Sequence, residues 1–169
     1  SVESEEQLAA VAQEFGFPLM LKSRRMAYDG KGNAVAKTAA DVKEAVAKLG
    51  GFEKGLYCEK WVPFERELAV MVVRARDGET RAYPVTETEH VDNICDVTIT
   101  PADVSAFVAA AATEAAQNAV ASLEGAGVFG VELFLLKDGS ILLNEIAPRP
   151  HNSGHYTIEA TACCQYQSH

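Results

Sequence analysis

A turn signal, Asp138-Gly139, stands between two apolar segments and constrains the fold more than any other feature of the chain. Residues 128–136 alternate as in a strand and residues 140–145 return, which is the pattern of a β-hairpin. With Asp138-Gly139 as a two-residue loop, Glu132 lies directly opposite Glu145. The sequence therefore predicts an antiparallel hairpin that carries two carboxylates on one face.

Two facing carboxylates repel each other, because paired side chains in a sheet have Cβ atoms roughly 5 Å apart. One carboxyl must hold its proton, both must turn to solvent, or a cation must lie between them. Mg²⁺ suits oxygen ligands on adjacent strands and binds substrate phosphates at the same time. We expect a metal here rather than a solvated edge, since the predicted neighbouring pairs are apolar: Phe134 with Leu143, and Leu136 with Ile141.

The segment after the hairpin, residues 144–155, reads N-E-I-A-P-R-P-H-N-S-G-H and concentrates charged and hydrogen-bonding groups. Its two prolines are predicted to hold Arg149 extended, so that the guanidinium is aimed with little loss of entropy. In the alternative interpretation, Arg149 pairs with one hairpin glutamate. Asn152 or Ser153 is predicted to cap a helix from Thr157 onward, whose first amides could bind an anion.

The chain of 169 residues is long enough for one domain or two small lobes, and its formal net charge of −9 argues against a general nucleic-acid or membrane surface. Four cysteines, two of them adjacent, show no C-x-x-C spacing and indicate neither a zinc site nor a disulfide framework. A reduced, cytoplasmic compartment is the simpler expectation. The chain starts and stops in helix-like patterns, without a secretion signal or a membrane-length apolar run, which suggests a piece of a longer protein.

A basic loop with two glycines, S-R-R-M-A-Y-D-G-K-G-N at residues 23–33, follows a short apolar strand that ends at Lys22. Glycines let backbone amides approach phosphate oxygens, and Lys31 can supply charge. The alternative is a hairpin turn centred on Asp29-Gly30, and both can hold in a hairpin whose tip covers a nucleotide. The loop lacks the G-x-x-x-x-G-K-[ST] pattern, which excludes a P-loop.

An apolar link, Trp61-Val62-Pro63-Phe64, joins two predicted strands and has the composition of a purine pocket. Glu59 and Glu67 could accept hydrogen bonds from the two ends of a nucleoside. From these residues alone, a core tryptophan and two exposed glutamates are the favoured interpretation. His90 lies in a segment, residues 87–96, that we expect to leave the sheet, where a histidine is more often a surface group than a ligand.

Hydrophobic spacing and turn signals place the other elements. Capping boxes at Ser4 and Thr38 open two predicted helices, and Pro101 opens a third, alanine-rich one. The buried stripe of the third is predicted to be Val104, Phe107, Val108, Ala111, Ala115 and Val120. The predicted helices are residues 4–16, 38–49 and 100–123, and the other predicted strands are residues 17–22, 34–37, 56–60, 65–76 and 80–86.

Five motifs span the chain: L-K-S-R-R-M-A-Y-D-G-K-G-N, E-K-W-V-P-F-E-R-E, E-T-E-H-V-D-N-I-C-D, G-V-F-G-V-E-L-F and N-E-I-A-P-R-P-H-N-S-G-H-Y-T-I-E-A. In order and spacing they resemble the ATP-grasp portion of the N5-carboxyaminoimidazole ribonucleotide synthetase family, the ATPase component of phosphoribosylaminoimidazole carboxylase. The sequences of these motifs most resemble the fungal bifunctional form. The resemblance implies an α+β ATP-grasp fold with antiparallel sheets flanked by helices: a small lobe at residues 1–60, a large lobe at residues 61–169 and nucleotide between them.

The resemblance also implies a role for each matching residue. ATP would be bound by Lys22, by the lid loop Ala27, Tyr28, Asp29, Gly30, Lys31, Gly32 and Asn33, by Glu59, Lys60, Trp61 and Val62 at adenine, and by Glu67, His90 and Asn144. Mg²⁺ would be held by Glu132 and Glu145. Bicarbonate and the ribonucleotide would face the catalytic residues Arg149, His151, Asn152, Ser153 and His155.

The implied reaction is the ATP-dependent carboxylation of 5-aminoimidazole ribonucleotide. Bicarbonate attacks the γ-phosphate to give carboxyphosphate and ADP, and the aminoimidazole amine then takes up the carboxyl group. The family has further N-terminal and C-terminal domains, so we expect the isolated chain to bind MgATP and to turn over poorly. The alternatives are a non-catalytic nucleotide-binding scaffold or another ATP-grasp carboxylate-amine ligase. No nucleic-acid or membrane partner is expected, and a homo-oligomer is left open.

Two stretches depart from patterns of related enzymes. Many ATP-grasp enzymes read E-x-N where this chain has Glu145-Ile146-Ala147, although alanine there resembles this particular family. The end of the chain, Ala160 to His169, differs from the family's usual sequence. The sequence offers no explanation for the Cys163-Cys164 pair within it.

Overall fold

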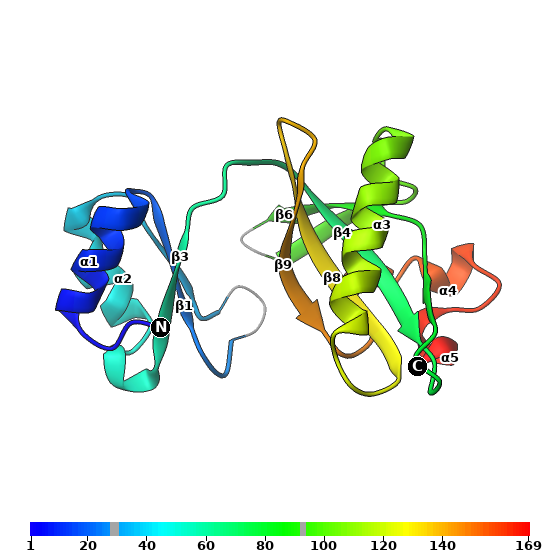
Figure 1. Ribbon diagram of the computed structural model, residues 1–169, viewed down its shortest axis with the longest axis horizontal. Coiled ribbons are helices and arrows are strands. Elements are labelled where there is room, and N and C mark those ends of the chain that lie inside the picture. The colour runs from blue at the N-terminus through cyan, green and yellow to red at the C-terminus, as the bar shows by residue number, and fades with distance from the viewer. Residues whose placement is uncertain (28–30, 92–93) are drawn as a thin grey trace. The chain divides into compact units, whose positions relative to one another are not determined.

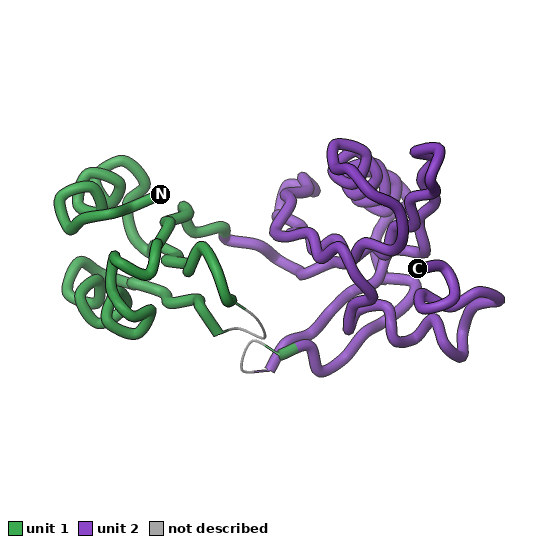
Figure 2. Tube along the Cα trace, turned by 90° about the horizontal axis from the view of Figure 1, so that it is seen from below, with its two compact units in different colours: residues 1–62, 92–94 green, residues 63–91, 95–169 purple. Residues whose placement is uncertain are grey.

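The computed structural model describes residues 1–27, 31–91 and 94–169, which divide into two compact units (Figure 2). The first unit consists of residues 1–62 with Ile94, and the other described residues form the second. Both units combine antiparallel strand pairs with helices, which confirms the predicted α+β class. In the described part of the chain, no helix has the length and apolar character needed to cross a membrane.

The first unit is a three-stranded antiparallel sheet covered by two α-helices (Figure 1). Ser4 caps the first helix by accepting a hydrogen bond from the Gln7 amide (3.3 Å), as its position in the sequence predicts. Leu19 and Leu21 alternate along the central strand and are fully buried beneath the helices. The elements are α1 (Glu5–Phe15), β1 (Leu19–Ser23), β2 (Asn33–Ala36), α2 (Val42–Lys48) and β3 (Leu56–Lys60), with 3₁₀ turns at Ala39–Asp41 and Phe52–Lys54, in the strand order β2-β1-β3.

The second unit is a six-stranded sheet with one long helix, α3, along one face (Figure 1). The strand order is β7-β6-β4-β8-β9, and β5 pairs with β4. The elements are β4 (Phe64–Arg74), β5 (Thr80–Ala82), β6 (Thr86–Val91), β7 (Ile94–Ile99), α3 (Ala106–Ala121), β8 (Gly127–Leu136), β9 (Ile141–Ala147), a 3₁₀ turn at Asn152–Gly154, α4 (Thr157–Ala160) and α5 (Gln165–Ser168).

Alternation along β4 and β8 gives this sheet two different faces. One face is apolar and packs against α3 through a single cluster that includes Leu68, Val70, Val72, Ala112, Ala116, Val120, Phe129, Val131 and Leu133. Glu67 and Glu132 occupy the intervening positions of β4 and β8. They therefore lie on the opposite face, which carries the candidate site.

The prediction that residues 87–96 leave the sheet is wrong. The return strand, β5, covers only Thr80–Ala82 and ends before the predicted residue 86, because Pro84 has no backbone amide with which to continue the ladder. The next strand, β6, pairs with β4 further along through residues 86–88, with Glu67 opposite Thr88. His90 therefore lies on a strand of the sheet.

The third helix begins later than predicted. Ser105 is its N-cap and accepts a hydrogen bond from the Val108 amide (3.2 Å), so Pro101 lies before the helix rather than in its first turn. Ala112, Ala116 and Val120 form the buried stripe. Of the predicted stripe, Val120 is buried, Val104 and Val108 pack partly against the core, and Phe107 is 77% exposed. Alanine on every side of the helix gave no reliable phase from which to predict the buried face.

Candidate functional site

The β8–β9 hairpin places Glu132 opposite Glu145, which confirms the predicted pairing. The predicted two-residue loop is nevertheless wrong. The Leu136 amide donates to the Ser140 carbonyl (2.9 Å), which leaves three residues in the loop, and Gly139 takes a φ of 83° to close it. Next to the loop, the pairs are Phe134 with Leu142 and Leu135 with Ile141, not the predicted Phe134 with Leu143 and Leu136 with Ile141.

A β-bulge at Asn144 restores the pairing of the two glutamates. Leu133 pairs with Leu143 and Glu132 pairs with Glu145, so Asn144 is the extra residue on β9. Without the bulge, the longer loop would place Asn144 opposite Glu132. Instead the Asn144 side chain reaches the acidic pair from the bulge, and its Nδ2 donates to Glu132 Oε2 (3.3 Å).

His151 joins this acidic pair from the segment that follows β9. Its Nε2 lies 3.7 Å from Glu132 Oε1, and one ligand atom from each of Glu132, Glu145 and His151 lies within 4.8 Å of the others. Gly130 makes the approach possible, because a Cβ at that position would come within 2.5 Å of the His151 Cβ. We call these three residues the acidic cluster.

The electrostatics of the acidic cluster favour a cation. Burial, and then the nearby carboxylate of Glu145, raises the pKa of Glu132 above its ordinary value. Protonation of Glu132 relieves the repulsion, and a divalent cation relieves it while both carboxylates stay ionised. Two carboxylates and an imidazole therefore fit a divalent cation that keeps positions for water and phosphate oxygens.

A histidine-carboxylate contact lies on the same face of the sheet. His90 on β6 meets Glu67 on β4 through Nδ1 and Oε2. This hydrogen bond is the main reason why the pKa of His90 is raised, and the charges of Glu67 and Glu132 add to the effect while burial opposes it. Burial, and then Glu132 and Glu67, also raises the pKa of the Cys95 thiol. These groups are therefore electrostatically coupled to the acidic cluster.

The residues predicted to face bicarbonate and the ribonucleotide follow β9. Arg149, Asn152 and His155 are exposed, whereas His151 and Ser153 are buried. Arg149 Nη1 donates to the Pro150 carbonyl (2.9 Å), and the guanidinium forms no ion pair with any carboxylate of the described residues. The alternative in which Arg149 pairs with a hairpin glutamate is therefore wrong.

The predicted helix cap at Asn152 or Ser153 is wrong. Residues 152–154 form a 3₁₀ turn that begins after His151, and α4 is a single turn with Tyr156 at its N-cap and no capping side chain. The polar groups bond locally instead: Ser153 Oγ lies 2.8 Å from His151 Nδ1, and Thr157 Oγ1 donates to the Gly154 carbonyl (2.6 Å).

In the first unit, Lys22 at the end of β1 forms an ion pair with Glu59 on the adjacent strand β3 (Nζ–Oε2, 2.7 Å). Trp61 is half-buried and Glu67 pairs with His90, so the interpretation as a core tryptophan with two exposed glutamates is wrong at both residues. The Glu59 side chain bonds Lys22 but is 45% exposed. Lys60 is exposed and Val62 is half-buried at the end of this unit.

The loop between β1 and β2 is described in part. Ala27 and Lys31 are exposed, Gly32 is half-buried, and Asn33 pairs with Lys22 across the β1–β2 ladder. Tyr28, Asp29 and Gly30, and with them the predicted Asp29-Gly30 turn, lie outside the described residues.

Two fully buried polar residues beside His151 were not predicted. Thr157 and Gln165 are both 0% exposed, and the Gln165 amide bonds the backbone of His151. Neither hydrophobic spacing nor a turn signal distinguishes a single buried glutamine from an exposed one. The sequence therefore offered no signal for this contact.

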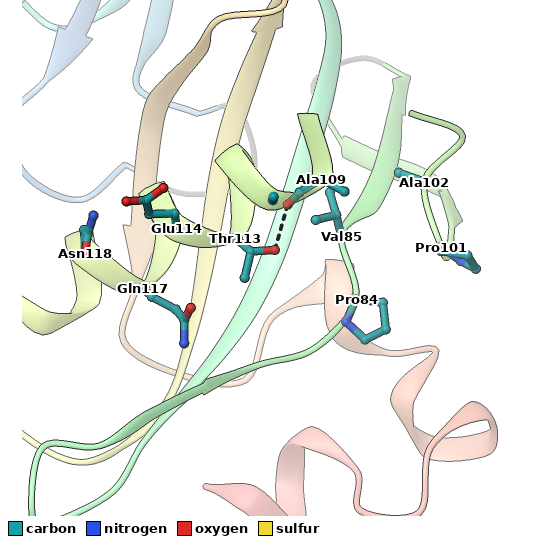
Figure 3. A pocket seen from close by; sticks show the side chains of 10 residues that line it. Pro84, Val85, Pro101, Ala102, Ala109, Thr113, Glu114, Gln117 and Asn118 are labelled. Carbon is teal, nitrogen blue, oxygen red and sulfur yellow. Dashed lines mark hydrogen bonds between the residues drawn. The ribbon is translucent and has the colours of Figure 1, made fainter. Parts of the chain in front are cut away.

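A separate cavity of about 530 Å³ lies beside α3 (Figure 3). It is lined by Pro84 and Val85, by Pro101 and Ala102, and by residues of α3 between Ala109 and Asn118. None of the predicted site residues lines it, so we do not assign the candidate chemistry to this cavity.

The sequence model of the ATP-grasp domain matches residues 1–166, a range that includes every candidate site residue and all but the last three residues of the chain. The chain belongs to the ATP-grasp family.

Two relatives and two solved structures show what the chain is similar to within this family. It is 54% identical, over its whole length, to a phosphoribosylaminoimidazole carboxylase of Ogataea methanolica, and 40% identical over 169 residues, or 99% of the chain, to an N5-carboxyaminoimidazole ribonucleotide synthase of Bacillus subtilis. The crystal structure of a carboxyaminoimidazole ribonucleotide synthase from Aspergillus clavatus complexed with ATP matches 99% of the chain with a TM-score of 0.94 and 48% identity. A structure of the Aspergillus clavatus enzyme with ADP and 5-aminoimidazole ribonucleotide matches with a TM-score of 0.91 and 46% identity.

These relatives are much longer than the chain. The chain spans 31% of the Ogataea protein, 44% of the Bacillus protein, and 44% and 43% of the two Aspergillus chains.

Proposed function

We propose that this chain is the ATP-grasp portion of an N5-carboxyaminoimidazole ribonucleotide synthetase, a ligase of purine biosynthesis. The proposed reaction converts ATP, bicarbonate and 5-aminoimidazole ribonucleotide into N5-carboxyaminoimidazole ribonucleotide, ADP and phosphate. Support comes from relatives of that name and from related structures that contain ATP, or ADP together with 5-aminoimidazole ribonucleotide.

The observation that carries the proposal is the facing pair Glu132 and Glu145. Their carboxylates are the proposed Mg²⁺ ligands. Asn144, which we propose lies near the nucleotide, donates a hydrogen bond to Glu132 that orients its carboxylate. A bound Mg²⁺ would neutralise charge on the phosphates and orient the terminal one for attack. The chain's own contribution is the hairpin, which holds the two carboxylates next to each other although they repel.

Polar and basic residues after β9 form the proposed acceptor side of the reaction. Attack by bicarbonate on a phosphate concentrates negative charge, which donors placed in advance can stabilise. Arg149 is exposed and makes no ion pair within the described chain, so its planar fork of donors can meet bicarbonate or carboxyphosphate. Exposed Asn152 and His155, and buried His151 and Ser153, complete this proposed set.

Further residues are proposed to contact the nucleotide. Lys22 contacts phosphates, the loop from Ala27 to Asn33 covers them, and Glu59 to Val62 receive adenine. Glu67 meets the ribose, and His90, fixed by Glu67, lies near the nucleotide. Residues 1–60 would thus act as the small lobe and residues 61–169 as the large lobe.

Calorimetry tests the binding step. ATP is expected to bind more tightly with Mg²⁺ than without it, and Glu132→Gln and Glu145→Gln are expected to remove that gain while leaving the fold intact. A wild-type chain without any metal-dependent gain would instead support a non-catalytic nucleotide-binding scaffold.

A coupled assay for ADP tests the reaction. Release of ADP that requires both bicarbonate and 5-aminoimidazole ribonucleotide is expected from the enzyme with the remaining length of its relatives, and little from these 169 residues alone. Strong turnover by the 169 residues alone would contradict the expectation that the reaction needs the rest of the enzyme. Turnover with a different amine acceptor would identify another ATP-grasp ligase.

The place of this activity in the cell is part of the same proposal. A cytoplasmic location is proposed, although a relative from Vigna aconitifolia, 55% identical over 150 residues, is named as a chloroplastic carboxylase. Fractionation of the source cells with an antibody to this chain would distinguish the two compartments.

A further inference from the structure

Gln165, at the start of α5, is a fully buried polar side chain that bonds one residue twice. Its Oε1 accepts from the His151 amide (2.8 Å), and its Nε2 donates to the His151 carbonyl (3.0 Å). One side chain thereby bonds both backbone groups of His151, as a neighbouring strand would, and the carbonyl also accepts from the Gly154 amide (3.0 Å).

Thr157 holds Gln165 in turn. Its hydroxyl donates to the Gly154 carbonyl (2.6 Å) and accepts from the Gln165 amide (3.0 Å), and Thr157 is itself 0% exposed. The backbone amide of Gln165 is therefore tied, through the Thr157 hydroxyl, to the turn that follows His151.

The imidazole of His151 is fixed at its other end. Nδ1 lies 2.8 Å from Ser153 Oγ, the Cβ packs against Gly130, and Nε2 lies 3.7 Å from Glu132 Oε1. Gln165 holds the backbone of His151 and Ser153 holds Nδ1, so Nε2 is directed at the Glu132–Glu145 pair.

Burial of a glutamine amide is unfavourable unless its bonds are made, and an apolar residue of similar size would fill the same space without that cost. The buried amide of Gln165 lies where it bonds both the backbone amide and the backbone carbonyl of His151. We propose that Gln165 is a positioning residue that holds the His151 imidazole at the Glu132–Glu145 pair. This inference rests on the proposed function, because it takes the Glu132–Glu145 pair as the ligands of a divalent cation and adds the His151 imidazole beside them.

The test compares two substitutions in the same terminal segment. Gln165→Met keeps the size of the side chain and removes both bonds to His151. Thr161→Val is the matched control, because it removes the hydroxyl bonds to the Thr157 and Cys163 carbonyls (both 2.8 Å) without touching His151. Two readouts are used: Mn²⁺ affinity from electron paramagnetic resonance, and the ¹⁵N signals of the His151 ring in metal-free protein.

Gln165→Met is expected to shift the His151 ring signals and to weaken Mn²⁺ binding about 10- to 100-fold, as loss of an outer partner of a metal site does. Thr161→Val is expected to lower the melting temperature and change neither readout. In a His151→Ala background, Gln165→Met should cause no further loss of Mn²⁺ affinity. A similar loss in both backgrounds, or ring signals that do not move, would overturn the proposal.

Gln165→Asn serves if the methionine variant does not fold. It keeps a buried amide but is one methylene too short to reach both groups, so the same shift and loss are expected to a smaller degree, and wild-type values in both readouts would overturn the proposal. Failure of the wild-type chain to bind Mn²⁺ would count against the proposed function, while the metal-free ring signals would still decide the role of Gln165.

Discussion

Glu132 and Glu145 occupy paired positions on β8 and β9, and the bulge at Asn144 is what keeps them paired. Replacing Glu132 by glutamine should weaken Mn²⁺ binding at least about tenfold, since it removes a charged oxygen ligand. The same change should raise the free energy of unfolding of the metal-free chain, because burial and Glu145 disfavour the ionised form of Glu132. Metal titration and urea denaturation measure the two effects.

Glu124→Gln is the control for Glu132→Gln, because Glu124 is exposed and lies outside the acidic cluster. It should change neither quantity. An unchanged Mn²⁺ affinity in Glu132→Gln would place the metal elsewhere, and a less stable metal-free protein would mean that Glu132 has a favourable partner that outweighs its repulsion by Glu145.

The contact between His90 and Glu67 should make stability depend on pH. The pKa of His90 is raised in the folded chain, chiefly by the hydrogen bond that the imidazole donates to Glu67, so the folded state binds the proton more tightly than the unfolded state. This contribution to stability is fully present below the unfolded value of about 6.5 and is lost as pH rises through the folded pKa. Urea denaturation across this range should show wild-type protein losing more stability than His90→Gln.

His155→Gln is the matched variant for the pH experiment, since His155 is exposed. Its stability should fall with pH as steeply as that of the wild type. Equal slopes for wild type and His90→Gln would show that the bond to Glu67 does not favour the protonated imidazole.

The hairpin shows what the sequence could and could not predict. Its existence, its antiparallel pairing and the opposition of Glu132 and Glu145 followed from a turn signal and alternating residues. The loop length and the bulge at Asn144 did not, because each shifts the register by one residue and the two shifts cancel at the glutamates. A correct contact was thus predicted from an incorrect register.

The surroundings of His151 were beyond prediction for a different reason. Helix phase, as at Phe107, and the burial of Gln165 depend on which distant segments pack together, and local residue patterns do not encode that information. Motif spacing could nominate His151, but only the packed chain shows that Gly130 leaves room for it and that Gln165 bonds its backbone.

Gly130 should be intolerant of a side chain because His151 occupies the space. A Cβ there would lie 2.5 Å from the His151 Cβ and 2.7 Å from its Cγ, so Gly130→Ala must move the imidazole or the strand. The expected cost is about 1–3 kcal/mol of stability together with weaker Mn²⁺ binding. Gly125→Ala is the control, because a Cβ there meets nothing within 4 Å although the backbone φ of 97° makes the substitution strained. It should cost stability and leave Mn²⁺ affinity unchanged.

Lys22 should matter more for nucleotide binding than for folding. Its ion pair with Glu59 joins a lysine that is 13% exposed to a glutamate that is 45% exposed, and such partly solvated pairs contribute less than about 1 kcal/mol. Lys22→Met should therefore leave the urea midpoint nearly unchanged, but weaken binding of a fluorescent ATP analogue about tenfold or more, because the proposed phosphate contact carries a full charge. Lys37→Met, at an exposed lysine just after β2, should change neither value. A large loss of stability with unaltered nucleotide affinity would mean that Lys22 serves the first unit's sheet rather than the nucleotide.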